Sequence, residues 1–382
     1  MYKHINSLTS LRGIAALVVV VHHFSYYTLP KTGATLSAYS DFFRNGYLWV
    51  DFFFILSGFI MSHVYIRDFA AKVSSNNYRS YLLSRFARIY PLHIFILFLF
   101  IGLEILKIFL LNHSAFTGKF HLTALFANIF LLQAFDLNCS PWFWCNTYWN
   151  EPAWSISVEF IIYCVFPFLL FFLLKNTQKN DLIIYVYTLF SLLLLVTFTR
   201  GNLDSIIGIP SIARCGLECV LGIITYKVYR QSNYKKYFNV NLLAIIAITW
   251  IIVIMHNYWH NLRSLHNWLV LPAFSLLILA VSVNNNSVIS KILNSRLMLY
   301  LGTISYSIYM VHWLIQELLK LFWIYKYNDA FGKGFTEYEA LVSLGGFLII
   351  TLLVASLTYR FVEVPMRNYL KSTLLAKQCI ER

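Results

Sequence analysis

Residues 8–27, LTSLRGIAALVVVVHHFSYY, are apolar apart from one arginine near the start and a few polar side chains at the ends. A helix needs about 20 residues to cross the hydrocarbon core of a bilayer, and this segment has that length. Apolar runs of similar length recur along the rest of the chain. The pattern predicts an all-α fold, a polytopic bundle of transmembrane helices.

The composition of the whole chain supports the same fold class. The 382 residues are 59% hydrophobic and only 12% charged, and the mean hydropathy is +0.64. A soluble domain usually carries about 25% charged residues. The composition therefore excludes a soluble enzyme, a disordered regulator and a disulfide-rich secreted module.

We expect ten transmembrane spans. They lie near residues 8–27, 47–66, 89–111, 154–174, 182–199, 209–226, 240–256, 267–284, 297–319 and 340–360. A shorter apolar run at 122–135 has only about 14 residues, and we expect it to be interfacial or re-entrant because a full span is longer.

The basic residues indicate the orientation of these spans. If the N-terminus is cytoplasmic, the inner segments carry 20 Lys and Arg residues and the outer segments carry 9, with Arg214 inside a span. Cytoplasmic loops are enriched in Lys and Arg, so we expect both termini to be cytoplasmic. Most of the net charge of +14 is then a topology signal, and nucleic acid is not an expected partner.

The domain organisation predicted from these runs is simple. Residues 1–370 are expected to form a single membrane-embedded domain, and 371–382 a short cytoplasmic tail. We expect neither a signal peptide nor an appended soluble domain. The six cysteines show no zinc pattern and no metal is expected. Cys139 and Cys145 share an outer loop and could form a disulfide in an oxidising compartment.

Five ionisable side chains fall in the outer halves of five different spans, or close to their outer ends: His23, Asp51, Glu159, Arg214 and His312. A buried Arg or Asp in a span costs at least about 2.5 kcal/mol, so such residues usually face a cavity or one another. Their common depth predicts a polar chamber that opens outward. For Asp51 and Arg214, pairing between helices is an equally good interpretation.

Arginines mark the inner ends of two spans. Arg12 precedes His23 by eleven residues, about 1100° of helical rotation, which places both near one face. Arg12 could instead extend to the lipid headgroups and His23 could lie at the interface. Arg85 and Arg88, three residues apart, could hold a phosphate-rich anion or form an ordinary positive flank.

Six segments together resemble the integral-membrane acyltransferase family 3, typified by bacterial O-antigen and exopolysaccharide O-acetyltransferases. The family's Arg, ten residues, His pattern is similar to LRGIAALVVVVHHF at 11–24. Its G-V-D-x-F-F-x-L-S-G-F pattern is similar to VDFFFILSGFI at 50–60, except that the glycine is displaced to Gly46. The other four segments are RFARIYP at 85–91, PAWSISVEF at 152–160, ISYSIYMVHW at 304–313 and FVEVPMRNYL at 361–370. The resemblance extends from residue 8 to about 370.

This resemblance implies transfer of an acyl group, usually acetyl, from cytoplasmic acetyl-CoA to a sugar hydroxyl of a cell-surface or lipid-linked polysaccharide. It also implies a bacterial inner membrane as the location, with membrane lipids around the protein. Histidine suits a general base because its ordinary pKa is about 6.5. We therefore predict His23 as the base or a transient acyl carrier, and Glu159 as the group that orients it.

The remaining candidates have binding roles. Arg12, Arg85 and Arg88 are predicted to hold the CoA phosphates, and Asp51, Arg214 and His312 to contact the acceptor. A multi-span transporter is the alternative, because intramembrane charges also line transport paths. The chain shows no internal repeat of the kind many transporters have. A third interpretation is a non-catalytic partner in polysaccharide export.

Overall fold

The structure is a computed structural model, and it describes residues 4–111, 116–135, 149–175, 180–198, 203, 209–231, 240–256, 267–283 and 288–380. These residues form helices and turns, with no strand among them. The all-α fold class is therefore confirmed for this part of the chain. Cys139 and Cys145 lie outside the described residues.

The chain divides into two compact units that alternate along the sequence. Unit 1 comprises Met1–Val18, Ser40–Arg79 and Ile161–Thr303, and unit 2 comprises Val19–Tyr39, Ser80–Phe160 and Ile304–Arg382. Three helices have residues in both units: α1 (Asn6–His23), α4 (Ser75–Leu111) and α6 (Trp154–Lys175).

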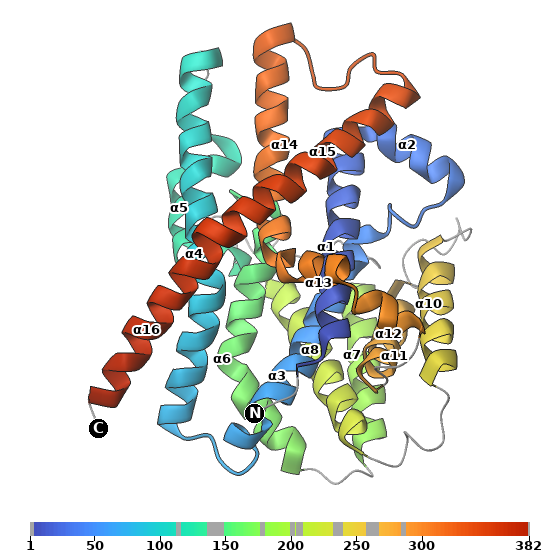
Figure 1. The fold of residues 1–382 in the computed structure, drawn as a ribbon, viewed down its shortest axis with the longest axis vertical. Helices are drawn as coiled ribbons and strands as arrows, with labels where there is room; N and C mark the ends of the chain where they lie inside the picture. Colours follow the sequence, from blue (N-terminus) through green and yellow to red (C-terminus); the bar gives the residue numbers. More distant parts are fainter. Residues whose placement is uncertain are drawn as a thin grey trace. The chain divides into compact units, whose positions relative to one another are not determined.

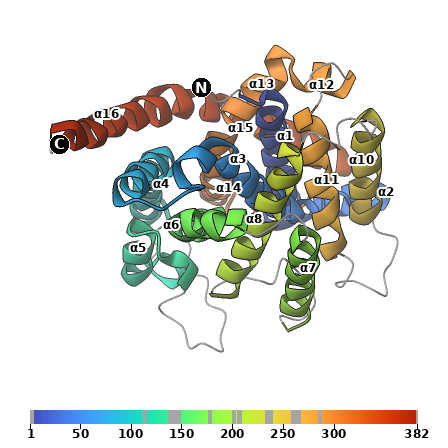
Figure 2. The same ribbon diagram turned by 90° about the horizontal axis from the view of Figure 1, so that it is seen from below.

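Unit 1 is built around α8, which packs against α3, α7 and α11, and α10 packs in turn against α11 (Figure 2). The helices that belong wholly to this unit are α3 (Trp49–Phe69), α7 (Asp181–Phe198), α8 (Ile209–Arg230), α10 (Val240–His256), α11 (Val270–Val283), α12 (Val288–Leu293) and α13 (Arg296–Thr303). Two short 3₁₀ turns, η2 (Gly46–Leu48) and η8 (Asn267–Leu269), precede α3 and α11.

The contact between α3 and α8 depends on two glycines. A Cβ atom on Gly222 would lie 2.1 Å from the carbonyl oxygen of Ile55, and a Cβ on Gly58 would lie 2.2 Å from that of Cys219. Small residues at such positions let helix backbones approach closely, which is a common way for helices to associate in membranes. The two helices therefore meet backbone to backbone.

Unit 2 contains α14 (Ser305–Tyr327), which packs against α15 (Glu337–Thr358). A π-helical turn, η9 (Tyr359–Glu363), joins α15 to α16 (Val364–Ile380), and Figure 1 shows the three as one long rod. The remaining elements of the unit are short: η1 (Phe24–Thr28), α2 (Pro30–Tyr39), η3 (Gly118–Phe120), α5 (Leu122–Ile129), η4 (Gln133–Phe135) and η5 (Glu151–Ala153).

Several of these helices are long and apolar enough to cross a membrane. Among the described residues they are Asn6–Thr28, Gly46–Phe69, Ser75–Leu111, Glu151–Lys175 and Glu337–Thr373, and the bent pair Arg296–Thr303 and Ser305–Tyr327 makes six if it counts as one span. Asp181–Thr197, Asn241–His256 and Asn267–Val283 are shorter apolar helices. The chain is therefore a membrane protein by helix length and composition, while ten spans and the orientation stay predictions.

The structure differs from the predicted boundaries at two places. The run at 297–319 is two helices, α13 and α14, that meet at a bend of 62°. Gly302 lies at this break, and a Cβ there would lie 1.9 Å from the carbonyl oxygen of Thr9, so α13 ends against the backbone of α1. The segment 75–88, which precedes the predicted span 89–111, is helical as well. Its polar residues keep the mean hydropathy low, so a hydropathy window does not detect this part of the helix.

Candidate active site

The last residue of α1 lies against the middle of α14 in unit 2. The Nδ1 atom of His23 lies 2.9 Å from the Nε2 atom of His312, and the two rings are nearly parallel. His312 is completely buried, whereas His23 is partly exposed. The structure thus joins two of the residues predicted to lie at the same depth into one imidazole pair.

Aromatic side chains surround the exposed member of this pair. The ring of Trp313 lies 5.4 Å from that of His23, edge to face, and the ring of Tyr27 lies 5.8 Å away. His22 precedes His23 in α1 and its ring lies 5.4 Å from the His23 ring. Trp313 is 3% exposed while Tyr27 is 46% exposed. His23 is therefore enclosed on one side and open on another.

Hydrogen bonds fix α14 at the level of His312. The Oγ1 of Thr28 donates to Oε1 of Gln316 at 2.6 Å, and the Nδ2 of Asn150 donates to the carbonyl oxygen of Met310 at 3.1 Å. The hydroxyl of Tyr309 donates to the carbonyl oxygen of Pro152 at 2.9 Å. These contacts come from η1 and from the segment before α6, so the imidazole pair is held from two directions.

Glu159 lies on α6 and is half-buried. It interacts electrostatically with Tyr306, whose hydroxyl donates to the carbonyl oxygen of Ile89 at 2.6 Å. The hydrogen bond that orients His23, within the part of the chain described, comes from His312. The role predicted for Glu159 stays a prediction.

Arg85 and Arg88 belong to a cationic cluster on α4 and α16. Lys371 interacts electrostatically with Arg85, Arg88 and Arg367. Glu363 is the acidic residue at its centre: it is fully buried, 2.6 Å from Nη1 of Arg88 and 3.6 Å from Nη1 of Arg367. The Oγ of Ser307 also donates to Glu363, at 2.8 Å. Four cations and this carboxylate leave a net charge of +3, which can attract a phosphate-bearing ligand.

Arg12 lies on α1 in unit 1. Its Nη2 donates to the carbonyl oxygen of Gly302 at 3.2 Å, so the guanidinium contacts the break between α13 and α14. The predicted contact with the CoA phosphates stays a prediction.

Asp51 and Arg214 form an ion pair in unit 1. Nη2 and Nε of Arg214 lie 2.6 and 2.7 Å from Oδ1 of Asp51, and both side chains are almost completely buried. Nη1 donates to the carbonyl oxygen of Leu203 at 2.7 Å. Glu218, one turn along α8, lies 3.6 Å from the same guanidinium. This geometry is that of pairing between α3 and α8, the second of the two interpretations that the sequence left open.

Three residues that contact these candidate residues were not themselves predicted as site residues from the sequence. Glu218 follows Arg214 by four residues, a spacing that could have predicted the ion pair. Glu363 was quoted only as part of a motif, yet it is the carboxylate that holds Arg88. Trp313 directly follows His312, but no spacing rule predicts that its ring contacts His23. Among the described residues, no group of three or more His, Cys, Asp or Glu side chains could hold a metal ion.

Comparison with known proteins identifies the family of the chain. The model of an acyltransferase domain, that of acyltransferase family 3, matches residues 5–360. The chain belongs to acyltransferase family 3. The family resemblance drawn from the six segments is therefore confirmed, and with it the class of enzyme, an acyltransferase.

Curated relatives of this family member include the O-acetyltransferase OatA of Staphylococcus aureus strains NCTC 8325, COL and MRSA252. Each is 22% identical over an alignment of 386 positions, which covers 96% of this chain and 58% of the relative. The chain thus spans somewhat more than half the length of the curated relatives it matches. No solved structure matches the chain.

Proposed function

We propose that this acyltransferase moves an acetyl group from acetyl-CoA to a hydroxyl of a cell-envelope polysaccharide or its lipid-linked precursor. The family supports acyl transfer, and the relatives named O-acetyltransferase support acetyl as the acyl group and oxygen as the acceptor atom. The observation that carries the proposal is the hydrogen bond between the partly exposed His23 and the buried His312.

In this mechanism the hydrogen bond between the two imidazoles has a defined donor and a defined acceptor. When both rings are neutral, only one of the two facing nitrogens, Nδ1 of His23 and Nε2 of His312, carries the hydrogen of their bond. We assign this hydrogen to Nδ1 of His23, so that Nε2 of His312 accepts the bond. Nε2 of His23 then has the free lone pair that a general base needs.

The reaction follows from that tautomer. Nε2 of His23 takes the proton of the sugar hydroxyl while the hydroxyl oxygen bonds to the thioester carbonyl carbon. The carbon–sulfur bond breaks, and CoA leaves as a thiolate that takes the proton back from His23. His312 accepts the Nδ1–H bond throughout and keeps the ring aligned, so it acts as a positioning residue. Glu159 remains a second candidate for orienting His23.

The donor occupies the cationic cluster in this proposal. CoA carries phosphates, and arginine binds phosphate bidentately. Arg88 is held by Glu363 and stacks within 5.9 Å of the Tyr306 ring centroid, so its position is fixed before a ligand arrives. Arg85, Arg367 and Lys371 add the charge that draws the anion to this end of α4.

We also propose the topology that the charge distribution predicts, with ten spans, both termini cytoplasmic and residues 1–370 acting as one membrane-embedded domain. Each of the ten apolar runs coincides with helical residues in the described chain. In this orientation the cationic cluster faces the cytoplasm, where acetyl-CoA is made, and His23 lies toward the outside. The membrane would be the bacterial inner membrane.

The test uses the full chain in lipid nanodiscs with radiolabelled acetyl-CoA and envelope glycan from cells that lack the gene. Label should pass to the glycan with the wild-type protein and be lost with His23→Ala, while the variant reconstitutes normally. His4→Gln is a matched control, because His4 is an exposed histidine whose hydrogen bonds, among the described residues, are to nearby Asn6 and Thr9. Full transfer by His23→Ala would refute the assignment.

A further inference from the structure

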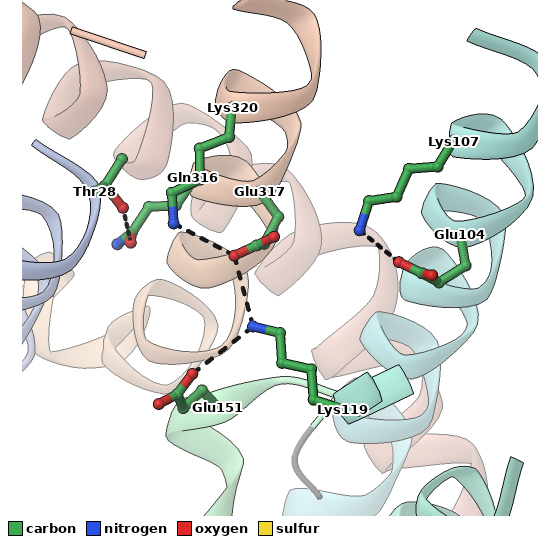
Figure 3. Close-up of polar contacts among 8 residues, drawn as sticks. All are labelled: Thr28, Glu104, Lys107, Lys119, Glu151, Gln316, Glu317 and Lys320. Carbon is green, nitrogen blue, oxygen red and sulfur yellow. Dashed lines mark hydrogen bonds and ion pairs between the residues drawn. The ribbon is translucent and has the colours of Figure 1, made fainter. Parts of the chain in front are cut away.

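A second group of charged residues lies beside the imidazole pair and has no part in the mechanism above. Nζ of Lys119, from the turn η3, lies 3.8 Å from Oε2 of Glu151 and 3.8 Å from Oε1 of Glu317 (Figure 3). Nζ of Lys320 lies 3.5 Å from Oε1 of Glu317. These four residues come from three separate segments of unit 2, and we call them the lysine–glutamate cluster. Their charges cancel.

Trp313 connects the cluster to His23. The ammonium of Lys119 lies 5.6 Å from the Trp313 ring centroid and that of Lys320 lies 5.8 Å away, while the ring of His23 is 5.4 Å away. Glu317 follows Trp313 by one helical turn, so both residues lie on the same face of α14. A group bound by the cluster would therefore lie next to the proposed base.

The ion pairs of the cluster are long. Both contacts of Lys119 exceed hydrogen-bond distance, so its ammonium forms no hydrogen bond with either carboxylate. Glu104 and Lys107, drawn in the same view, give the contrast, because Nζ of Lys107 donates to Oε1 of Glu104 at 2.6 Å (Figure 3). In the cluster, Lys119, Glu151 and Lys320 are each about 30% exposed. Donors and acceptors therefore remain for a ligand.

Trp313 supplies an independent sign of a ligand. Its indole Nε1–H is buried and has no hydrogen-bond partner among the described residues, and the side chain as a whole is 3% exposed. An unsatisfied buried donor costs about 1–3 kcal/mol. The ammonium of Lys119 lies 5.6 Å from the centroid of this ring, so a ligand hydroxyl that binds Lys119 would lie close to the indole.

We infer that the lysine–glutamate cluster and Trp313 bind the acceptor sugar and select a neutral one. Sugar hydroxyls both donate and accept hydrogen bonds, which matches carboxylates, ammonium groups and an indole N–H placed side by side. An acidic sugar would meet Glu151 and Glu317, while both lysines are already neutralised. The inference rests on the proposed function, since it names the acceptor of the same reaction.

The experiment measures acetyl transfer by the full chain in nanodiscs to glycan from cells lacking the gene, separated into neutral and acidic fractions by anion exchange. Glu317→Gln and Lys119→Met should each raise the half-saturating glycan concentration roughly tenfold, equivalent to about 1.4 kcal/mol, and leave that of acetyl-CoA unchanged. With the wild-type protein, the acetyl label should enter the neutral glycan fraction. Trp313→Phe, which keeps a ring but removes the N–H, should also weaken acceptor binding.

The double variant Glu104→Gln with Lys107→Met is the matched control, because it removes a Lys–Glu pair that, among the described residues, has a ring contact with Phe120 and none with Trp313. Lys119→Arg, which keeps the positive charge, should retain most of the acceptor affinity that Lys119→Met loses. A melting curve for each variant separates misfolding from lost binding. Unchanged glycan dependence in folded Glu317→Gln and Lys119→Met, or label confined to the acidic fraction, would overturn the inference. Absence of any transfer by the wild type would instead refute the proposed function.

Discussion

Nδ1 of His23 and Nε2 of His312 lie 2.9 Å apart, although 289 residues separate the two histidines in the chain. At least one of these nitrogens must carry a hydrogen for the contact to be a hydrogen bond, so the two rings share one proton between them. The buried ring of His312 therefore restrains both the orientation and the tautomer of the exposed one.

The first prediction concerns the positioning role of His312. His312→Ala should lower kcat roughly 10- to 100-fold and leave the KM for acetyl-CoA unchanged, because the base remains present but poorly aligned. His23→Ala removes the base and should cost about 10²–10⁴-fold. Steady-state kinetics in nanodiscs measures both. If His312→Ala has wild-type kcat, the orientation of His23 depends on another group, and Glu159→Gln is the next variant.

The second prediction is that the two histidines act as a unit. Residues that act together in catalysis are strongly non-additive, so the double variant His23→Ala with His312→Ala should be no slower than His23→Ala alone. A double variant whose loss equals the product of the two single losses would show that the histidines contribute separately. Expression and melting temperature of all three variants provide the folding control.

The third prediction concerns the cationic cluster. Arg85→Ala with Arg88→Ala should raise the KM for acetyl-CoA at least about tenfold, since each charge-assisted hydrogen bond contributes about 1.5–3 kcal/mol. Lys371→Ala should have a smaller effect, because lysine lacks the bidentate geometry of arginine. The matched comparison is acetyl-CoA that lacks its 3′-phosphate: if these residues bind that phosphate, the variants should discriminate less between the two donors. An unchanged KM for acetyl-CoA would leave the arginines with a role in membrane orientation only.

Much of the fold follows from hydropathy, because a bilayer requires long apolar helices. The starts and ends of helices were harder to predict. The polar residues 75–88 extend α4 beyond its apolar part, and Gly302 ends α13 inside an apolar run. A hydropathy window averages over such local features, so it joins α13 to α14 and shortens α4.

The candidate site was predictable in part. Helical rotation and depth pointed to His23 and His312, and the contact between them agrees with the expectation that ionisable groups in spans face one another. The lysine–glutamate cluster was not predicted, because Lys119 and Glu151 come from short turns and the other two members lie about the outer end of the predicted span 297–319, where charges are ordinary. Only tertiary contacts bring them to Trp313.

The fourth prediction concerns the buried ion pair of unit 1. Arg214→Met should lower the free energy of unfolding by roughly 3–5 kcal/mol, because Asp51 and Glu218 would remain buried without a cation. Neutralising both carboxylates as well, with Asp51→Asn and Glu218→Gln, should recover much of this loss. The melting temperature in detergent checks the order of the variants. Lys333→Ala, which removes an exposed ion pair with Asp329, should have almost no effect. A triple variant as unstable as Arg214→Met would contradict the pairing argument.

The fifth prediction tests the backbone contact between α3 and α8. Gly222→Val places a side chain 2.1 Å from the carbonyl oxygen of Ile55, a distance at which the helices must separate. Overpacking of this kind typically costs about 1–3 kcal/mol, occasionally more, so the melting temperature should fall. Gly345→Val is the matched control, since a Cβ on that glycine of α15 meets no atom within 4 Å. Asp51 and Arg214 span the same two helices, so Gly222→Val should also loosen their ion pair, and combined with Arg214→Met it should destabilise by less than the sum of the two single changes. Equal melting temperatures for Gly222→Val and Gly345→Val would rule out a close contact at this point.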